Sequence, residues 1–167
     1  MFVTSIQKEI RQSKPFASKA QEAAVALLRT ADLVRRNVAA VLEPYEITAQ
    51  QYNVLRILRG AGEKGLPTLD IVERLIEETP GITRLIDRLE EKQLVARERC
   101  LTDRRQVFCR ITKEGLKLLT KLDKPLNASE GQSLGHLKKR ELDALVDLLD
   151  RAREGLNQQL IEVRRKS

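Results

Sequence analysis

The sequence predicts a mainly α-helical protein that carries one small β-hairpin. Only 3% of the 167 residues are aromatic and none is Trp, so the core must be built from Leu, Ile, Val and Ala, a palette that favours helices. Apolar residues recur at intervals of three and four over most of the chain, and they alternate with polar residues only around residues 94–112.

The N-terminal part is expected to form a leader and one long helix. Residues 1–18 are polar, and either pack on a partner as an arm or fray. A helix is expected from about Ser18 to Leu42, where Pro44 ends it. Its apolar stripe comprises Ala24, Leu27, Ala31, Val34, Val38 and Val41.

Two short helices should follow, each capped by a threonine. Thr48 and Gln51 fit a capping box that opens a helix to about Arg59, and Thr68 fits the N-cap of a helix that runs through Leu75. The buried positions expected in these two helices are Tyr52, Leu55, Leu58, Leu69, Val72 and Leu75.

A third helix is predicted to start sharply and to end near Gln93. Thr79 is its expected N-cap, and Pro80 would occupy the first helical position, where a missing N–H costs nothing. One apolar face is expected to hold Ile82, Leu85, Ile86 and Leu89.

The segments 94–101 and 106–112 then predict a two-stranded hairpin around the polar residues 102–105. A two-residue turn at 104–105 would place Cys100 opposite Cys109. Both cysteines are expected first as small apolar residues, with a redox pair as the alternative.

The C-terminal part is expected to supply two more helices. One begins at Lys113 and fades near residues 127–135, and the last spans about residues 138–163. The apolar positions of the first are Leu116, Leu119 and Leu122, and the seam of the second comprises Leu142, Leu145, Leu149, Ala152, Leu156 and Val163. Such a seam needs a partner helix, so Leu142, Leu145, Leu149 and Leu156 are predicted to form a homodimer contact.

Positive charge is concentrated on the third short helix and the hairpin. Residues 82–113 hold nine Lys and Arg against five Asp and Glu, which is an excess of four out of the net charge of +7, whereas residues 46–81 hold four basic and six acidic residues. Two short helices followed at once by a basic hairpin predict a winged helix-turn-helix with helical dimerisation arms, in which the helix at about 80–92 enters the major groove and residues 95–112 form the wing.

Several other classes of protein are not expected. His136 is the single histidine and lies in a polar linker far in sequence from both cysteines, so neither an enzyme site nor a metal or other cofactor is predicted. No stretch approaches the roughly 20 apolar residues of a membrane span, and no signal peptide is recognisable, which predicts a cytoplasmic protein. An adaptor that uses a winged helix to bind protein is the second alternative, but it would be expected to lose the basic residues of the helix and wing.

Four segments in this order resemble the MarR family of transcriptional regulators. They are residues 83–92 (TRLIDRLEEK), 94–97 (LVAR), 103–105 (DRR) and 111–115 (ITKEG). The resemblance is strongest over residues 48–119. It implies an N-terminal arm over 1–45, a DNA-binding domain over 46–115 and C-terminal dimerisation helices over 116–167.

The resemblance also implies roles for individual residues in binding duplex DNA. Thr83 and Arg84 would reach base edges in the major groove, and Arg88 would contact the backbone one turn further on. Pro80 and Gly81 would let the start of the helix approach a phosphate. The alternative for the side chains on the helix is a solvated face without a DNA contact. The alternative for Pro80 and Gly81 is that they only mark the start of the helix.

At the wing tip, the resemblance sends Arg105 into the minor groove beside Arg104, with Asp103 holding its guanidinium. A surface salt bridge within the turn is the alternative. The family implies a repressor that releases DNA when a small aromatic or anionic effector binds between the arm and the DNA-binding domain, and some relatives sense oxidants through cysteine.

Two positions depart from the family pattern. Gln93 stands where the family usually has Gly after the recognition helix, at a cost of roughly 1 kcal/mol for a left-handed residue. Lys138 stands where many relatives have a Ser or Thr cap.

Overall fold

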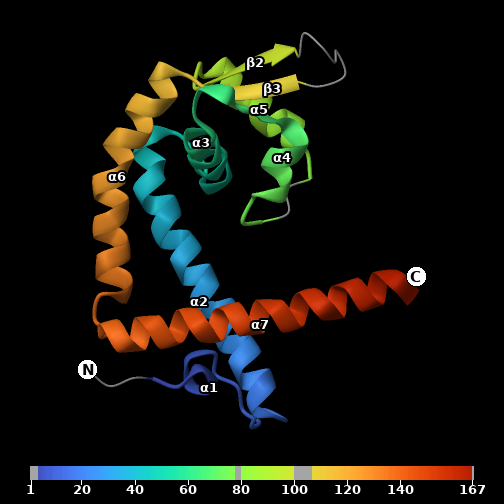
Figure 1. Ribbon diagram of the computed structural model, residues 1–167. Helices are drawn as coiled ribbons and strands as arrows, with labels where there is room; N and C mark the ends of the chain where they lie inside the picture. Colours follow the sequence, from blue (N-terminus) through green and yellow to red (C-terminus); the bar gives the residue numbers. More distant parts are fainter. Residues whose placement is uncertain (1–3, 78–79, 100–106, 167) are drawn as a thin grey trace. The chain divides into compact units, whose positions relative to one another are not determined.

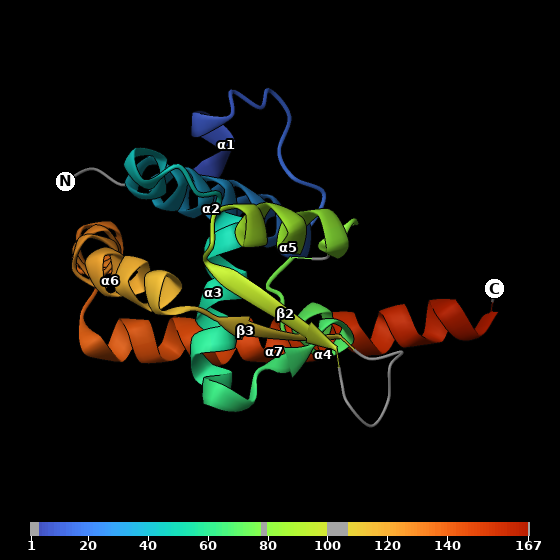
Figure 2. The same ribbon diagram turned by 90° about the horizontal axis from the view of Figure 1, so that it is seen from above.

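The computed structural model describes residues 4–77, 80–99 and 107–166 (Figures 1 and 2). Two compact units, Met1–Asn127 and Ala128–Ser167, are described separately. The mainly helical fold with one hairpin is confirmed. The elements in order are α1 (Ile6–Glu9), α2 (Lys19–Leu42), the 3-10 turn η1 (Glu43–Tyr45), α3 (Ala49–Ala61), the 3-10 turn η2 (Gly62–Lys64), β1 (Leu66–Pro67), α4 (Thr68–Glu73), α5 (Ile82–Glu91), β2 (Val95–Arg99), β3 (Val107–Ile111), α6 (Lys113–Leu134) and α7 (Lys139–Lys166).

Helix α2 has the predicted ends but a largely open apolar stripe. It begins after the Ser18 cap and ends before Pro44, which lies in η1. Its last turn buries Leu42, whereas Leu27 and Val34 are 42% and 41% exposed. Most of the stripe is therefore available for a contact outside the described residues.

Helix α3 opens with the predicted capping box. The Thr48 hydroxyl accepts from the Gln51 backbone N–H at 3.2 Å, and the Gln51 side-chain oxygen accepts from the Thr48 backbone N–H at 3.0 Å. These bonds satisfy two of the N–H groups that a helix start leaves unpaired. Leu55 and Leu58 are buried as predicted, whereas Tyr52 is only half-buried.

Helix α4 differs from its prediction in both cap and face. Its N-cap is Pro67, and Thr68 makes no capping hydrogen bond. Ile71 is fully buried and Leu75, beyond the end of the helix, is half-buried, whereas Leu69 and Val72 are 76% and 37% exposed, so two of the three expected buried positions were wrong. The helix has only six residues, which are too few for apolar spacing to define its face.

Helix α5 begins later than predicted. Gly81 is its N-cap, with a φ of +89° that glycine adopts without strain. Pro80 therefore precedes the helix and does not occupy its first position, while Thr79 lies outside the described residues. The predicted apolar face is confirmed by the buried Leu85, Ile86 and Leu89 and the half-buried Ile82.

The end of α5 shows how the chain turns into the hairpin. Gln93 has a φ of +58°, the left-handed conformation that the family pattern implies. Its N–H donates to the Glu90 carbonyl at 2.8 Å, and the Leu94 N–H donates to the Leu89 carbonyl at 2.9 Å. This is the Schellman ending of a helix, and the two leucines that accompany it are both buried.

The hairpin belongs to a three-stranded antiparallel sheet of order β1-β3-β2. β1 was not predicted, because two residues carry no alternation to recognise. The two strands of the hairpin are confirmed, and their register runs from Val95 opposite Ile111 to Arg99 opposite Val107.

This register overturns the predicted pairing of the cysteines. Cys109 lies opposite Arg97 on one side and Leu66 on the other, so the register of a two-residue turn was wrong. Cys100 itself lies outside the described residues. The reason for the error is that hairpin register follows from loop length, which the sequence did not define.

The C-terminal helices are longer than expected. α6 continues to Leu134 through Pro125 and does not fade near residue 127. α7 reaches Lys166, and its first turn is capped by Glu141, whose carboxylate accepts from the Lys138 backbone N–H at 2.7 Å. This bond is the glutamate half of a capping box, and it pairs the N–H of the cap residue and not the N–H groups that a Ser or Thr cap would pair.

One hydrophobic core holds the first unit together. The core positions are Leu42, Ile47, Val54, Leu55, Leu58, Leu66, Ile71, Leu85, Ile86, Leu89, Leu94, Val95, Cys109, Leu119, Leu122 and Leu126.

Among the described residues, no helix has the length and apolar character to cross a bilayer.

Candidate nucleic-acid interface

The outward face of α5 carries the predicted DNA-reading residues. Thr83, Arg84 and Arg88 are exposed, because Leu85 and Leu89 hold the opposite face in the core. The two guanidiniums lie one helical turn apart. Among the described residues neither has an ion-pair partner.

Among the described residues, no carboxylate of α5 forms an ion pair with Arg88. Asp87 instead forms an ion pair with Arg97 of β2, and Glu91 makes no ion pair within the described ranges. Arg84 and Arg88 therefore keep their charge available on the exposed face.

The start of α5 is open. A Cβ placed on Gly81 would meet no atom within 4 Å, and Pro80 before it is exposed. The N-cap residue Gly81 has no side chain to cap the first turn of the helix, and no other described side chain does so. Its first backbone N–H groups therefore lie where an acceptor from another molecule could reach them.

Arg97 joins β2 to two carboxylates of α5. Its Nε and Nη2 donate to Glu90 Oε2 at 2.8 Å and 2.6 Å, and Nη2 also donates to Asp87 Oδ1. Hydrogen bonding from this guanidinium holds the pKa of Glu90 below its ordinary value, and the same bonds raise the pKa of Arg97. Arg97 had no predicted role. The sequence shows two carboxylates three residues apart and a cation on the next strand, but not that these groups meet.

The base of the wing is set by a close approach between α6 and Leu94, the residue before β2. The Thr112 hydroxyl accepts from the Gly115 N–H at 3.0 Å and donates to the Gln93 carbonyl at 2.7 Å. A Cβ on Gly115 would lie 2.4 Å from the Leu94 carbonyl oxygen, so only glycine fits. These contacts explain in physical terms why a Thr and a Gly stand at the wing exit.

The outer part of the wing is described only along its strands. Arg110 of β3 pairs with Glu98 of β2 at 2.9 Å, so this ion pair lies within the hairpin. Asp103, Arg104 and Arg105, the predicted wing-tip residues, lie outside the described residues.

Cys109 is a buried thiol in the middle of the sheet. Its Sγ lies 3.8 Å from the Thr68 hydroxyl, and burial raises the pKa of the thiol. A raised pKa keeps the thiol protonated and unreactive at neutral pH. This environment agrees with the apolar role predicted for Cys109.

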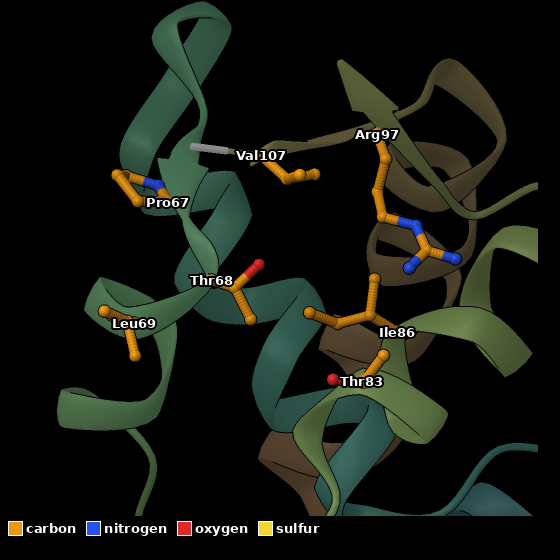
Figure 3. A pocket seen from close by; sticks show the side chains of 7 residues that line it. All are labelled: Pro67, Thr68, Leu69, Thr83, Ile86, Arg97 and Val107. Carbon is orange, nitrogen blue, oxygen red and sulfur yellow. The ribbon is translucent and has the colours of Figure 1, made fainter. Parts of the chain in front are cut away.

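A cavity of about 310 Å³ lies between α5, the start of α4 and the hairpin (Figure 3). Thr83 and Ile86 of α5 face it from one side and Arg97 from another. The remaining lining residues are Pro67, Thr68, Leu69 and Val107.

The predicted dimerisation residues lie on α7 in the second unit. Leu142, Leu145 and Leu149 are half-buried, and Leu156 is 53% exposed.

In the described part of the chain, no group of three or more His, Cys, Asp or Glu residues could hold a metal ion.

The helix pair α4–α5, the hairpin beside α5 and the third strand β1 define a winged helix-turn-helix protein, a class that binds DNA. Comparison with known families gives the narrower assignment. The family model "Transcriptional regulator SarA/Rot" matches residues 37–122, more than half of the chain.

Solved structures and a characterised relative agree with that match. The MarR transcription factor from Planctomyces limnophilus is 41% identical, with a TM-score of 0.64 over 81% of this chain and 98% of that one. The HTH-type transcriptional regulator MhqR of Bacillus subtilis (strain 168) is 28% identical over 116 residues, 70% of this chain and 77% of MhqR. A mutant MarR from E. coli complexed with operator DNA is 21% identical, with a TM-score of 0.74 over 83% and 99% of the two chains.

The chain belongs to the MarR family of winged-helix transcriptional regulators, as the resemblance implied. It is a DNA-binding regulator and not an enzyme, because the proteins that it resembles are transcription regulators.

Proposed function

We propose that this regulator binds a specific duplex as a homodimer, with α5 in the major groove and the hairpin at the minor groove. One observation carries the proposal: within the described residues, Arg84 and Arg88 stand exposed and without ion pairs on α5, while Asp87 and Glu90 of the same helix are paired with Arg97. The helix thus presents cations and withdraws two of its anions.

Individual residues take different parts in this proposal. Arg84, with Thr83 beside it, reads base edges, since a guanidinium can pair bidentately with guanine. Arg88 contacts the backbone, and Pro80 and Gly81 leave room for a phosphate at the start of α5. At the wing tip, Arg105 enters the minor groove next to Arg104, with Asp103 holding it.

The homodimer is supported by apolar side chains that the described chain leaves exposed. Leu27 and Leu28 of α2 are 42% and 70% exposed, and Leu156 and Leu160 of α7 are 53% and 56% exposed. The proposed division is an arm over 1–45, a DNA-binding domain over 46–115 and dimerisation helices over 116–167. Two recognition helices related by a two-fold axis require a pseudo-palindromic site with half-sites roughly 10 base pairs apart, or a multiple of that.

We also propose that the protein is a repressor that a small aromatic or anionic effector releases from DNA. A single feature of the first unit supports this: the cavity of about 310 Å³ is lined by Pro67, Leu69, Ile86 and Val107, by Thr68 and Thr83, and by one charged residue, Arg97. Because Arg97 already binds Asp87 and Glu90, an anionic effector would have to compete with them. Benzoate titrated into the protein–DNA complex tests the idea, and a complex unaffected at millimolar benzoate would contradict it.

The decisive experiment separates the helix from the wing. Arg84→Ala should weaken binding to the selected site by about 1–3 kcal/mol more than binding to scrambled DNA, because it removes a base contact. Arg105→Ala should weaken both duplexes evenly and lower the salt slope by about one unit. Lys121→Ala, which removes an exposed cation of α6, is the matched control. If Arg84→Ala leaves the ratio of the two affinities unchanged, α5 does not read the bases.

A further inference from the structure

Helix α5 carries more negative than positive charge of its own. Between Ile82 and Glu91 there are three carboxylates, Asp87, Glu90 and Glu91, against the two guanidiniums of Arg84 and Arg88. A helix of this charge would by itself repel the phosphates that flank a groove. A cation from another element that pairs with these carboxylates would reduce this repulsion.

Arg97 supplies that cation through a connected set of bonds. Glu90 uses both of its oxygens on this one residue: Oε2 accepts from the guanidinium at 2.6 Å and 2.8 Å, and Oε1 accepts from the Arg97 backbone N–H at 3.2 Å. Asp87, one turn earlier, accepts from the same guanidinium. Because the backbone of β2 takes part, the bonds define where α5 lies along the edge of the sheet, and not only its charge.

Leu85, Ile86 and Leu89 pack in the core, but packing alone is not directional, and the other described hydrogen bonds near α5 lie away from its middle. The Schellman ending and the bond from Thr112 to Gln93 act at the C-terminal end of the helix. In the first half of α5, the cavity of about 310 Å³ separates Thr83 and Ile86 from Val107 of β3. Figure 3 shows the Arg97 side chain reaching across this space toward α5.

We propose that Arg97 is a positioning residue for DNA reading, which holds α5 at a set angle to the wing through Asp87 and Glu90 and cancels their charge. It touches no base in this role. The inference rests on the proposed placement of α5 in the major groove. Arg97 then affects specificity through the position of Arg84, and affects non-specific binding through the charge of the two carboxylates.

Two variants separate position from charge. Arg97→Lys keeps the positive charge but loses the planar fork that reaches two carboxylates at once. The double variant Asp87→Asn with Glu90→Gln keeps Arg97 and removes the anions. Arg110→Lys is the matched control, because its partner Glu98 lies within the hairpin and not on α5.

Affinities are measured for a duplex that the parent protein selects from a random library and for a scrambled duplex of the same composition, at several salt concentrations. Arg97→Lys should lower the ratio of the two affinities about tenfold, with scrambled binding changed less than about twofold. The double variant should lower the ratio similarly while scrambled binding becomes stronger, since two repulsive charges are gone. Arg110→Lys should change neither quantity.

Hydrogen exchange without DNA supplies an independent measurement. The amides of α5 should exchange faster in Arg97→Lys than in the parent, and those of α3 should not. Unchanged affinity ratios in both variants, together with a lowered ratio in Arg84→Ala, would overturn the positioning role and leave the proposed function intact. If Arg84→Ala also leaves the ratio unchanged, the placement of α5 has failed instead.

Discussion

The winged-helix lobe, residues 42–126, and helix α7 differ in where their apolar side chains lie. Every residue of the buried core falls between Leu42 and Leu126, and eleven of the largest side chains there are essentially inaccessible. None of the described side chains of α7 is buried, and its exposed apolar residues include Leu148, Leu156 and Leu160. The lobe therefore completes its own core, whereas α7 leaves its described apolar side chains half-buried or exposed.

The same contrast separates two kinds of apolar residue on the lobe itself. Leu58 is fully buried in α3, and Leu69 of α4 is 76% exposed beside the cavity. Two leucines of one unit thus lie in opposite environments. Leu58 packs in the core, and Leu69 is exposed at the surface.

The largest effect is expected in the core. Leu58→Ala should lower the free energy of unfolding by about 2–5 kcal/mol, because it opens a cavity that its neighbours cannot fill. Leu69→Ala, the control at an exposed position, should stay within about 0.5 kcal/mol of the parent. Urea titration followed by circular dichroism measures both. Equal losses in the two variants would show that the lobe is not packed as described.

A charge on α7 should act on association and not on the lobe. Burial of a leucine contributes about 1.5–3 kcal/mol, so Leu156→Glu should weaken the proposed dimer by more than about tenfold. Asn157→Glu adds the same charge one position along the helix and is the control. Sedimentation over a range of protein concentrations measures the dissociation of the dimer in each variant. A Leu156→Glu protein that still sediments as the parent does would remove α7 from the interface.

Glycines of α6 offer a smaller contrast between packed and open positions. Gly115→Ala should destabilise the lobe by about 1–3 kcal/mol, because its Cβ would meet the Leu94 carbonyl oxygen at 2.4 Å. Gly131→Ala, where a Cβ meets nothing within 4 Å, should stabilise the helix by about 0.5–1 kcal/mol. Thermal unfolding of the two variants gives the comparison. A loss of stability in both variants would mean that the room for a Cβ does not explain why a glycine stands at position 115.

The smallest effect concerns the pH dependence of the bond between α5 and the wing. The pKa of Glu90 is lower in the folded protein than its ordinary value of 4.5, so its bond to Arg97 stabilises the fold above that pH and is lost as the pH falls through the folded pKa. Glu90→Gln should therefore cost less than about 1 kcal/mol at pH 7, since the pair is partly exposed, and the difference from the parent should shrink below pH 4.

Urea unfolding of the parent and of Glu90→Gln at pH 7 and pH 3.5 measures this difference. Glu91→Gln is the control, because Glu91 makes no ion pair among the described residues. A difference that grows on acidification would contradict the sign of the linkage.

Local sequence rules predicted the features that depend on a few neighbouring residues. The capping box of Thr48 and Gln51 and the buried face of Leu85, Ile86 and Leu89 follow from hydrogen-bonding and apolar spacing within one helix. The buried face predicted for α4 was wrong because the six residues of this helix are too few to define a face. The site divides in the same way: the exposure of Arg84 and Arg88 could be predicted from their own helix, and the pairing of Arg97 with Asp87 could not.

The sequence by itself determined that this chain is a helical protein with a basic hairpin, and its motifs placed it in the MarR family. Helix periodicity and charge are properties of consecutive residues, so they can be read without coordinates. Only the tertiary structure decided that Cys109 lies opposite Arg97 and that Arg97 binds the carboxylates of α5. Strand register depends on loop geometry and on packing between distant segments, and a single register shift changes every cross-strand neighbour.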